Sequence, residues 1–330
     1  MKTKFPLGDK ELRIGILGMT EGNGHPYSWS AMFNNFHPER MRNCPFPVIP
    51  AYLSKQPKST IGIPGAHITH IHCDIRADAE DVSASTFIPN IVDGPEDMIG
   101  EIDAVIVATD IGSEHVRRCR PFIEAGIPMF VDKPLADNEN DLKIFTKWRD
   151  EGAEILSSSS MRYLKEAMPY HNGRTYELGD LRYISALSPK KWETYGIHPL
   201  ELIYPIVGPG FESIQNTGAY ERNILHIKHR RGIDINIALI KDMFGGGDTL
   251  ITGTAGHTYI RGGDSYYCFK TQLDAFVKWL RDGVDPYPFS ETQELMKLVI
   301  GGIRSREEGG RKVMLTEIRE SSGISSYAST

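Results

Sequence analysis

The segment from Asp103 to Asp150 constrains the fold of this chain more than any other. It begins with a short apolar run, DAVIVAT, which is typical of a strand buried on both faces of a parallel sheet. A helical stretch follows and ends at Gly126, a residue type suited to the position after a helix. A second apolar strand, Met129 to Val131, ends at Asp132-Lys133-Pro134. The pattern predicts a strand–helix–strand unit that presents a lysine where open α/β sheets bind ligands.

The order of the remaining elements predicts two domains. Up to about residue 152, strands such as Arg13–Leu17 and Ile68–Cys73 alternate with helical stretches, which implies a parallel sheet. Beyond it, runs that alternate polar with apolar residues suit an antiparallel sheet with one covered face. We therefore expect an α/β fold. Residues 1–152 would form a Rossmann parallel sheet, with an insertion at about 37–66, and residues 153–330 an α+β domain with a mostly antiparallel, open-faced sheet.

Glycine-rich breaks and helical periodicity predict turns and helices in the second domain. The breaks at residues 245–247 and 262–263 are interpreted as hairpin turns. Two helices, about Tyr267–Asp282 and Ser290–Glu308, close the chain, and the last is a candidate to pack back on the first domain. A single sheet with helices on one side leaves its other face uncovered, which predicts a homodimer or homotetramer built through that face.

Composition limits the class of protein. The 330 residues, 40% hydrophobic and 24% charged, are ordinary for a globular protein of two domains. The net charge of −6 argues against a nucleic-acid or anionic-membrane partner. No apolar run reaches transmembrane length, and the N-terminus lacks the apolar stretch of a signal peptide. Four widely spaced cysteines without a C-x-x-C pair favour a cytoplasmic protein. No ligand spacing predicts a metal site.

A glycine-rich turn follows the first predicted strand, at the place where a dinucleotide-binding unit carries G-x-G-x-x-G. Here it reads Gly18-Met-Thr-Glu-Gly22-Asn-Gly24-His-Pro, about two residues longer, with Thr20 in place of a glycine. Backbone N–H groups at the helix start could still hold phosphate. A carboxylate at Glu21 would repel a pyrophosphate unless it points away. The alternative interpretation is a connection that has lost the cofactor.

Asp74 ends the second predicted strand. An acid there can bond both ribose hydroxyls and repel a 2′-phosphate, which favours NAD over NADP. The neighbouring Arg76 leaves NADP open, and a solvated Asp74 that caps the next helix is the alternative.

Several motifs resemble one family. The segment Thr109 to His115, the AGIP step and the following DKPLA are similar to the glucose–fructose oxidoreductases, inositol dehydrogenases and their relatives (Gfo/Idh/MocA). Asp132 stands where the family usually has Glu. The likeness continues through SSSSMRY, YGIHPLEL and YPFSETQELMKLVIGGIRSREEGGRKVML, and so covers nearly the whole chain. It implies an NAD(P)-dependent dehydrogenase or reductase that transfers a hydride between nicotinamide and a hydroxyl or carbonyl of a sugar, cyclitol or sugar acid.

The predicted site residues follow from their positions in the chain and from the resemblance to this family. Lys133 is the first catalytic candidate, because burial or a neighbouring positive nicotinamide would make it easier to deprotonate. His198 is the second, in a segment where the family reads D-x-G-x-H and this chain has Thr194 for the aspartate. Either these two share the proton transfer, or Glu193 or Tyr195 substitutes. Cofactor contacts are expected from Gly18, Thr20, Gly22, Asn23, Gly24, His25, Asp74, Thr109, Ile111, His115, Asp132 and Lys133, although a structural role is favoured for His115. Substrate contacts are expected from Arg162, Lys191, Trp192, Tyr195 and His198, with Lys190 beside them.

Two other functions remain open from the sequence. Thr20, Glu21 and Thr194 fit a binding or regulatory protein that keeps the fold without turnover. A glycosidase or lyase that uses bound nicotinamide for transient oxidation, as some relatives do, is the other. All three interpretations imply a small-molecule ligand.

Overall fold

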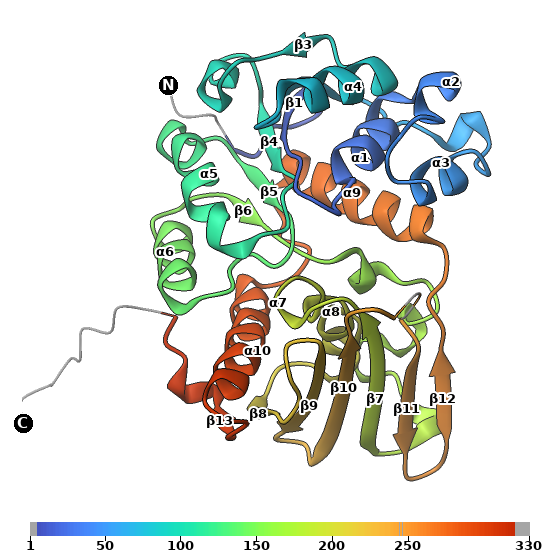
Figure 1. Ribbon diagram of the computed structural model, residues 1–330, viewed down its shortest axis with the longest axis vertical. Helices are drawn as coiled ribbons and strands as arrows, with labels where there is room; N and C mark the ends of the chain where they lie inside the picture. Colours follow the sequence, from blue (N-terminus) through green and yellow to red (C-terminus); the bar gives the residue numbers. More distant parts are fainter. Residues whose placement is uncertain (1–4, 244, 246, 321–330) are drawn as a thin grey trace, which may run out of the picture.

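Two β-sheets, one above the other in Figure 1, organise the computed structural model, which describes residues 5–243, 245 and 247–320. The first sheet has the order β3-β2-β1-β4-β5-β6, and every pair in it is parallel. Its strands are β1 (Leu12–Leu17), β2 (Ala66–His72), β3 (Asn90–Ile91), β4 (Ala104–Val107), β5 (Met129–Val131) and β6 (Ile155–Leu156). The predicted Rossmann-type sheet is confirmed. Because β6 pairs with β5, this sheet extends beyond the boundary expected at residue 152.

Helices cover the first sheet on both faces, which explains why its central strands are apolar throughout. All four residues of β4 are buried. The helices are α1 (His25–Asn34), α2 (Pro38–Met41), α3 (Val48–Leu53), α4 (Arg76–Thr86), α5 (Gly112–Ala125) and α6 (Glu139–Asp150). As predicted, α5 ends at Gly126, which adopts the left-handed conformation (φ 68°). The strand order reverses between β1 and β4, so ligands are expected in the crevice at the carboxyl ends of these strands.

The second sheet has seven strands in the order β12-β11-β7-β10-β9-β8-β13. They are β7 (Leu181–Pro189), β8 (Phe211–Asn216), β9 (Arg222–His229), β10 (Ile233–Ile240), β11 (Thr249–Gly253), β12 (His257–Ile260) and β13 (Val313–Met314). Its pairs are antiparallel except for β7 with β10, which run parallel. The prediction of a mostly antiparallel sheet is confirmed.

The interpretation of both glycine-rich breaks as hairpin turns is wrong. Residues 241–248 connect β10 to β11, which lie on opposite sides of β7. Residues 261–264 lead from β12 into α9 (Ser265–Asp282). The hairpins instead join β8 to β9, β9 to β10 and β11 to β12, through connections that contain Gly218, Gly232 and Gly256. A glycine marks a place where the chain can reverse, but it does not determine which strand becomes the neighbour.

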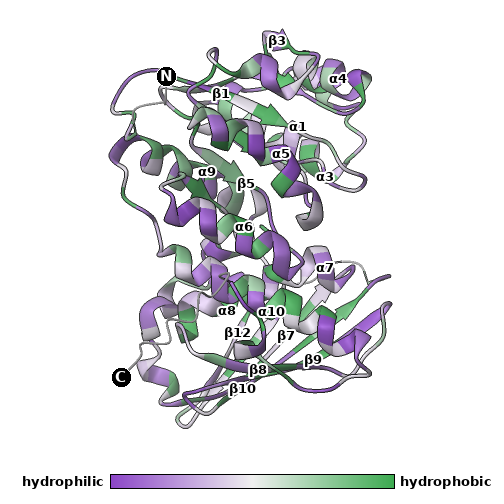
Figure 2. Ribbon diagram, turned by 90° about the vertical axis from the view of Figure 1, so that its left-hand side faces the viewer, coloured by the Kyte–Doolittle hydropathy of each residue, from purple (hydrophilic) through white to green (hydrophobic). Residues whose placement is uncertain are grey.

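Helices α7 (Trp192–Tyr195), α8 (Ile197–Val207) and α10 (Phe289–Glu307) lie on one side of the second sheet. Figure 2 shows this sheet with α8 and α10 between it and the first domain, and no helix on the opposite face. Alternate residues of β10, such as Ile235 and Ile237, are buried beneath these helices, whereas Asn236 is exposed. The predicted open face is therefore present. Within the described residues, no helix is both long and apolar enough to cross a bilayer.

Helix α9 packs back on the first domain, and the last helix, α10, also contacts it, because Gln293 and Arg304 of α10 bond Thr146 and Glu139 of α6. Tyr266, Leu273 and Phe276 of α9 join the core formed around β1 and β2. The last helix, α10, packs on the second sheet and touches α6. The insertion at 37–66 contains α2 and α3, and α3 contacts α9. The inserted segment and α9 thus cover neighbouring parts of the same domain.

Candidate active site

Lys133 follows β5 by two residues and is almost fully buried, with 4% of its side chain exposed. Its Nζ lies 3.5 Å from Oδ2 of Asp110, which follows β4. The other oxygen of Asp110 accepts a hydrogen bond from Thr20 Oγ1 at 2.7 Å. The carboxyl ends of β1, β4 and β5 are thereby joined through one carboxylate.

Asp132 forms a second carboxylate centre beside Lys133 and has no exposed surface. It accepts hydrogen bonds from Nδ2 of Asn23 at 3.0 Å and from the backbone N–H of Lys133 at 2.8 Å. Nδ1 of His25 lies 2.6 Å from its Oδ2. Burial alone would raise the pKa of Asp132, but His25 and Lys133 outweigh it and hold the pKa well below its usual value. An ionised Asp132 therefore fixes the end of the glycine loop to the Asp-Lys-Pro turn.

The charge state of Lys133 differs from the expectation. Burial alone would lower its pKa, but the carboxylates of Asp132 and Asp110 outweigh burial and raise the pKa above its usual value. Lys133 is thus a buried cation in the protein without ligand. Deprotonation of this lysine by burial, as expected from the sequence, is not what these surroundings favour.

The second domain brings Tyr195 and His198 to the same place. Tyr195 ends α7, and His198 lies in the first turn of α8. The two rings meet edge to face with their centres 4.7 Å apart, and Lys133 Nζ lies 5.4 Å from the centre of the Tyr195 ring. The expected meeting of Lys133 with His198 across the two domains is therefore present in the geometry.

His198 is held as a neutral imidazole. Burial, followed by the positive charge of Lys133, lowers its pKa well below the usual value. Its Nδ1 lies 2.6 Å from Oγ of Ser159, a fully buried residue that also accepts the backbone N–H of Met161. Ser159 thus fixes one edge of the ring, and Nε2 is the nitrogen left for a ligand.

A cavity of about 680 Å³ opens beside these residues, and Tyr195 and His198 form part of its wall. Further wall residues come from the ends of β7 and β10 and from the start of α9. Many are apolar, including Met161, Leu164 and Leu202. The cavity is large enough for a sugar-sized ligand.

The glycine loop fits a bound dinucleotide in part. Side chains at Gly18 and Gly24 are excluded by the protein itself: a Cβ would lie 2.4 Å from Pro26 and 2.5 Å from Phe46 of the insertion. Gly22 (φ 78°) is different, because a Cβ there would meet only Lys190 Nζ, at 3.8 Å. Glu21 is exposed. Backbone at Gly22 is therefore the part of the loop that a phosphate can approach closely.

Two further positions fit the two ends of a dinucleotide. Oγ1 of Thr109, at the end of β4, is buried and has no hydrogen-bond partner among the described residues. Such a group is costly unless a ligand satisfies it. Asp74 follows β2, has 54% of its side chain exposed and is held by Arg118 of α5. Ile111, at the start of α5, is only partly buried, so part of its surface is accessible to a ligand.

The structure places two of the predicted substrate contacts away from the cavity wall. Trp192 is fully buried and donates its Nε1–H to the carbonyl of Val299, so it belongs to the core. Arg162 is buried and bonds Glu201 and Glu291, and it is not part of the cavity wall.

Three more candidates do not reach a ligand position either. Lys191 precedes α7 and does not line the cavity. His115 is fully buried, with both ring nitrogens at backbone carbonyls, of Leu135 (3.1 Å) and Thr109 (2.8 Å), which supports its structural role. Glu193 bonds Arg306, so of the two substitutes for the missing aspartate only Tyr195 faces Lys133.

Sequence reasoning missed Asp110, Ser159 and Arg118. Asp110 directly follows Thr109 at a strand end, so the rule that located Lys133 could also have found it. Ser159 lies in the SSSSMRY motif without a signal that separates it from the other serines. Arg118 contacts Asp74 across 44 residues of sequence, which no local pattern reveals. The described residues contain no group of three His, Cys, Asp or Glu side chains that could hold a metal ion.

Comparisons with known proteins agree with this fold. Residues 47–157 match the family model GFO_IDH_MocA, described as an oxidoreductase family with an NAD-binding Rossmann fold. The search of curated proteins found no match. Among solved structures, scyllo-inositol dehydrogenase from Lactobacillus casei superimposes with a TM-score of 0.73 at 14% identity, covering 94% of this chain and 100% of that one. Myo-inositol dehydrogenase from Corynebacterium glutamicum superimposes with a TM-score of 0.70 at 17% identity, covering 92% and 98%.

These identities establish a shared fold, and the family match adds the class of cofactor and reaction. The scyllo-inositol dehydrogenase from L. casei has also been crystallised with NAD(H) and scyllo-inositol, and that structure superimposes with a TM-score of 0.68 at 14% identity over 93% of this chain and 100% of that one. The resemblance, the oxidoreductase class and the NAD cofactor predicted from the sequence are confirmed at this level. Over residues 47–157 the chain is similar to the Gfo/Idh/MocA oxidoreductase family, whose model describes an NAD-binding Rossmann fold.

Proposed function

We propose that this protein is an NAD-dependent dehydrogenase or reductase that interconverts a hydroxyl and a carbonyl of a sugar, cyclitol or sugar acid. The observation that carries the proposal is the meeting of Lys133, from the end of β5, with Tyr195 and His198 of the second domain beside a 680 Å³ cavity. Titratable groups with shifted pKa values that converge on a cavity are typical of catalytic sites.

The cofactor would be held by residues of the first domain. Gly22 lets a phosphate approach the backbone, Thr109 offers an unpaired hydroxyl, and Asp74 presents a half-exposed carboxylate for the ribose. Bound there, the nicotinamide supplies the acceptor or donor of the hydride. Three of the predicted cofactor contacts would support the cofactor site from behind, because their polar groups already bond one another: Asn23, His25 and Asp132.

The two catalytic candidates have different roles in this proposal. His198 is neutral, so in the oxidative direction its free Nε2 accepts the proton of the substrate hydroxyl. Lys133 is charged, so it stabilises the negative charge that develops on the substrate oxygen. In the reductive direction the same groups return the proton. Tyr195 lies between them and positions the substrate.

Lys190 suggests which substrates fit best. It lines the cavity, adopts the left-handed backbone conformation (φ 64°) and lies 4.3 Å from the centre of the Tyr195 ring. Its one polar contact among the described residues is the carbonyl of Gly22, at 3.5 Å. A cation without a carboxylate partner at the edge of a cavity favours a substrate that carries a carboxylate, that is, a sugar acid.

The function is tested by binding and by turnover. Calorimetric titration should show NAD binding, and a screen of polyols and sugar acids should show net reduction of NAD. With Lys190→Met, the KM for a sugar acid should rise about tenfold while that for a neutral polyol stays the same, since an exposed ionic hydrogen bond is worth about 1–2 kcal/mol. Absence of NAD binding would favour the regulatory interpretation. Nicotinamide released on denaturation without net reduction of any substrate would favour a glycosidase or lyase.

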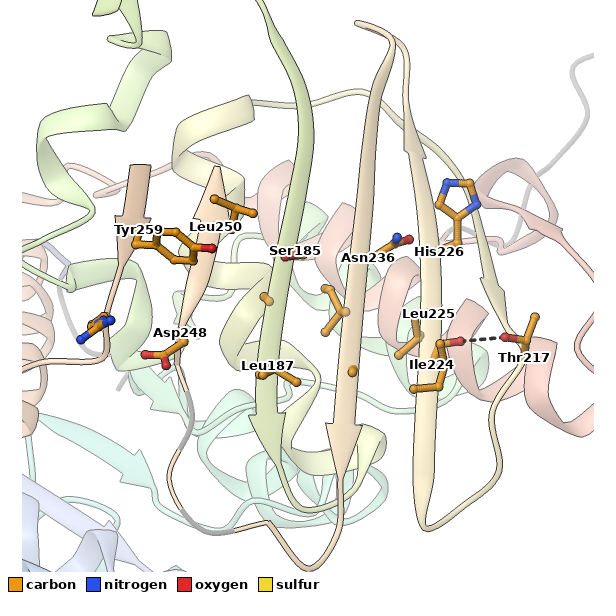
Figure 3. Close-up of a pocket in the computed structure, with 14 residues that line it drawn as sticks. Ser185, Leu187, Thr217, Ile224, Leu225, His226, Asn236, Asp248, Leu250 and Tyr259 are labelled. Carbon is orange, nitrogen blue, oxygen red and sulfur yellow. Dashed lines mark hydrogen bonds between the residues drawn. The ribbon is translucent and has the colours of Figure 1, made fainter. Parts of the chain in front are cut away.

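The open face of the second sheet supports an oligomer. Figure 3 shows Leu187, Ile224 and Tyr259 on this face, around a hollow of about 470 Å³. Their exposed fractions are 44%, 45% and 63%, which is high for large apolar side chains that share one surface. A second copy of the chain that covers this face would bury them. Light scattering at micromolar concentration should show a dimer or tetramer, and Ile224→Lys should give a monomer. A wild-type monomer would contradict the assembly without affecting the proposed reaction.

A further inference from the structure

The surroundings of Asp74 contain a second charged group that could serve a different cofactor. Arg118 lies in the second turn of α5, and only 7% of its side chain is exposed. Its Nη1 donates to Oδ1 of Asp74 at 3.0 Å and its Nη2 to Oδ2 at 2.6 Å. The guanidinium thus faces the carboxylate in the bidentate geometry that Arg prefers for planar anions.

Glu114 completes the cluster on the same helix. It accepts hydrogen bonds from Nε and Nη2 of Arg118 at 2.9 and 2.7 Å. Arg118 is therefore enclosed between two carboxylates, and Asp74 is the more exposed of them, at 54% against 32% of the side chain. Of the two acids, Asp74 is the one that separates the guanidinium from a ligand at the end of β2.

The cluster explains how Asp74 favours NAD. Arg118 uses one hydrogen-bonding position on each carboxylate oxygen, and each oxygen retains a second one. The hydrogen bonds from Arg118 hold the pKa of Asp74 below its usual value, so the carboxylate is ionised and fixed in orientation. A ribose diol can donate to it, whereas a 2′-phosphate would meet a negative charge.

Arg76, the residue that left NADP open from the sequence, does not share this arrangement. It is exposed and bonds Glu80 and Asp93 on the side of α4. Arg118 is the cation that contacts the ribose-binding carboxylate, and it does so from a helix that follows a different strand.

We propose that Arg118 is a latent 2′-phosphate site that Asp74 covers, so that this one carboxylate determines the choice between NAD and NADP. The inference rests on the proposed binding of NAD at this crevice. With Asp74 shortened to serine, the guanidinium would face the ribose edge. Its fork of N–H donors matches a phosphate, whose charge would replace that of the lost carboxylate.

The test uses binding rather than turnover. Wild type, Asp74→Ser and the double variant Asp74→Ser/Arg118→Met are titrated calorimetrically with NAD, NADP and 2′,5′-ADP. Asp74→Ser should bind NADP and 2′,5′-ADP about 10- to 100-fold more tightly than wild type, because charge-assisted hydrogen bonds to the phosphate contribute that much affinity. The same variant should bind NAD more weakly than wild type. The double variant should lose the gain. Asp74→Ser/Arg120→Met is the matched control, because Arg120 lies on the same helix but over Trp148.

A further variant covers the case in which the double variant fails to fold. Asp74→Ser/Glu114→Gln keeps Arg118 and removes the remaining competing carboxylate, so it should bind 2′,5′-ADP more tightly than Asp74→Ser alone. The proposal is overturned if Asp74→Ser gains no affinity for NADP or 2′,5′-ADP, or if the gain persists without Arg118. Failure of wild type to bind NAD would instead contradict the proposed function.

Discussion

Replacement of Lys133 by methionine should affect both stability and turnover, and the structure sets the size of each effect. The ammonium lies 3.5 Å from Asp110 and both groups are buried. At an effective dielectric constant of about 20, two unit charges at that separation attract by about 5 kcal/mol. Removing one member of a buried pair commonly costs about 3–5 kcal/mol, because the other charge is left uncompensated. We expect Lys133→Met to lower the free energy of unfolding by that amount at pH 7.5.

A second variant separates stability from catalysis. In Lys133→Met/Asp110→Asn the carboxylate closest to the lost ammonium is removed with it, and Asp132 keeps its hydrogen bonds to Asn23 and His25, so part of the lost stability should return. Turnover should stay about 10²- to 10⁴-fold below wild type in both variants, because neither has the cation at the reacting oxygen. Urea unfolding followed by tryptophan fluorescence and steady-state kinetics give the two readouts. Wild-type turnover in Lys133→Met would refute the catalytic role, and unchanged stability would refute the buried pair.

Three further outcomes are expected. His198→Ala should lower turnover about 10²- to 10⁴-fold, with the Lys133→Met/His198→Ala variant little worse than the worse single one, and additive losses in kinetics would contradict a joint role. Burial lowers the folded-state pKa of His198, and that of His171 to about 4. Each ring therefore stabilises the fold fully above the unfolded-state pKa of about 6.5, and its contribution decreases as the pH falls below that value. Urea unfolding should therefore show a loss of up to about 1.4 kcal/mol per pH unit for each ring between pH 6.5 and 4.5, and a flat profile there would contradict the burial of these rings. Gly112→Ala should cost about 1–3 kcal/mol in thermal unfolding despite the better helix propensity of alanine, since the added Cβ would lie 2.7 Å from the backbone nitrogen of Asp137, and unchanged stability would show that this contact relaxes.

The sequence predicted the elements of the fold well because their patterns are local. Met129–Val131 was located with the bounds that the structure has, since an apolar run ends where burial ends. The pairing of strands was less predictable. The glycines at 245–247 lie between strands that β7 separates, and only the complete sheet reveals that.

The site was predictable where topology alone fixes a residue, as at Lys133, and not where a side chain has to be assigned to one face of a short element. Trp192 and Tyr195 occupy the same four-residue helix, yet one is in the core and the other in the cavity wall. Arg162 shows the same limit, because its charge indicated a ligand whereas two glutamates already compensate it. Contacts between distant segments, such as Arg118 with Asp74, have no sequence signal at all.

Two departures from the family pattern meet at the same lysine, and together they lead to a last prediction. The resemblance to the family implies a proline where this chain has Asp110, and an aspartate where it has Thr194. Asp110 lies 3.5 Å from Lys133 Nζ, and the ring centre of Tyr195, the neighbour of Thr194, lies 5.4 Å from the same ammonium. We propose that a carboxylate of the first domain, Asp110, takes the place of the one absent at Thr194 in the second.

If this exchange is functional, Asp110→Asn should lower turnover, because Lys133 loses one of the two carboxylates that keep it charged, the one 3.5 Å from its Nζ. Adding Thr194→Asp should then restore part of the activity by returning a carboxylate to the position that relatives use. Thr292→Asp in the same background is the control, since Thr292 is also buried but lies in α10, whereas Thr194 is in α7 next to Tyr195. The pH profile of kcat/KM distinguishes repair of the site from a general change in stability. The apparent pKa that Lys133 contributes to this profile should shift in Asp110→Asn and shift back only with Thr194→Asp. Equal recovery with both additions, or none with either, would show that the two departures are unrelated.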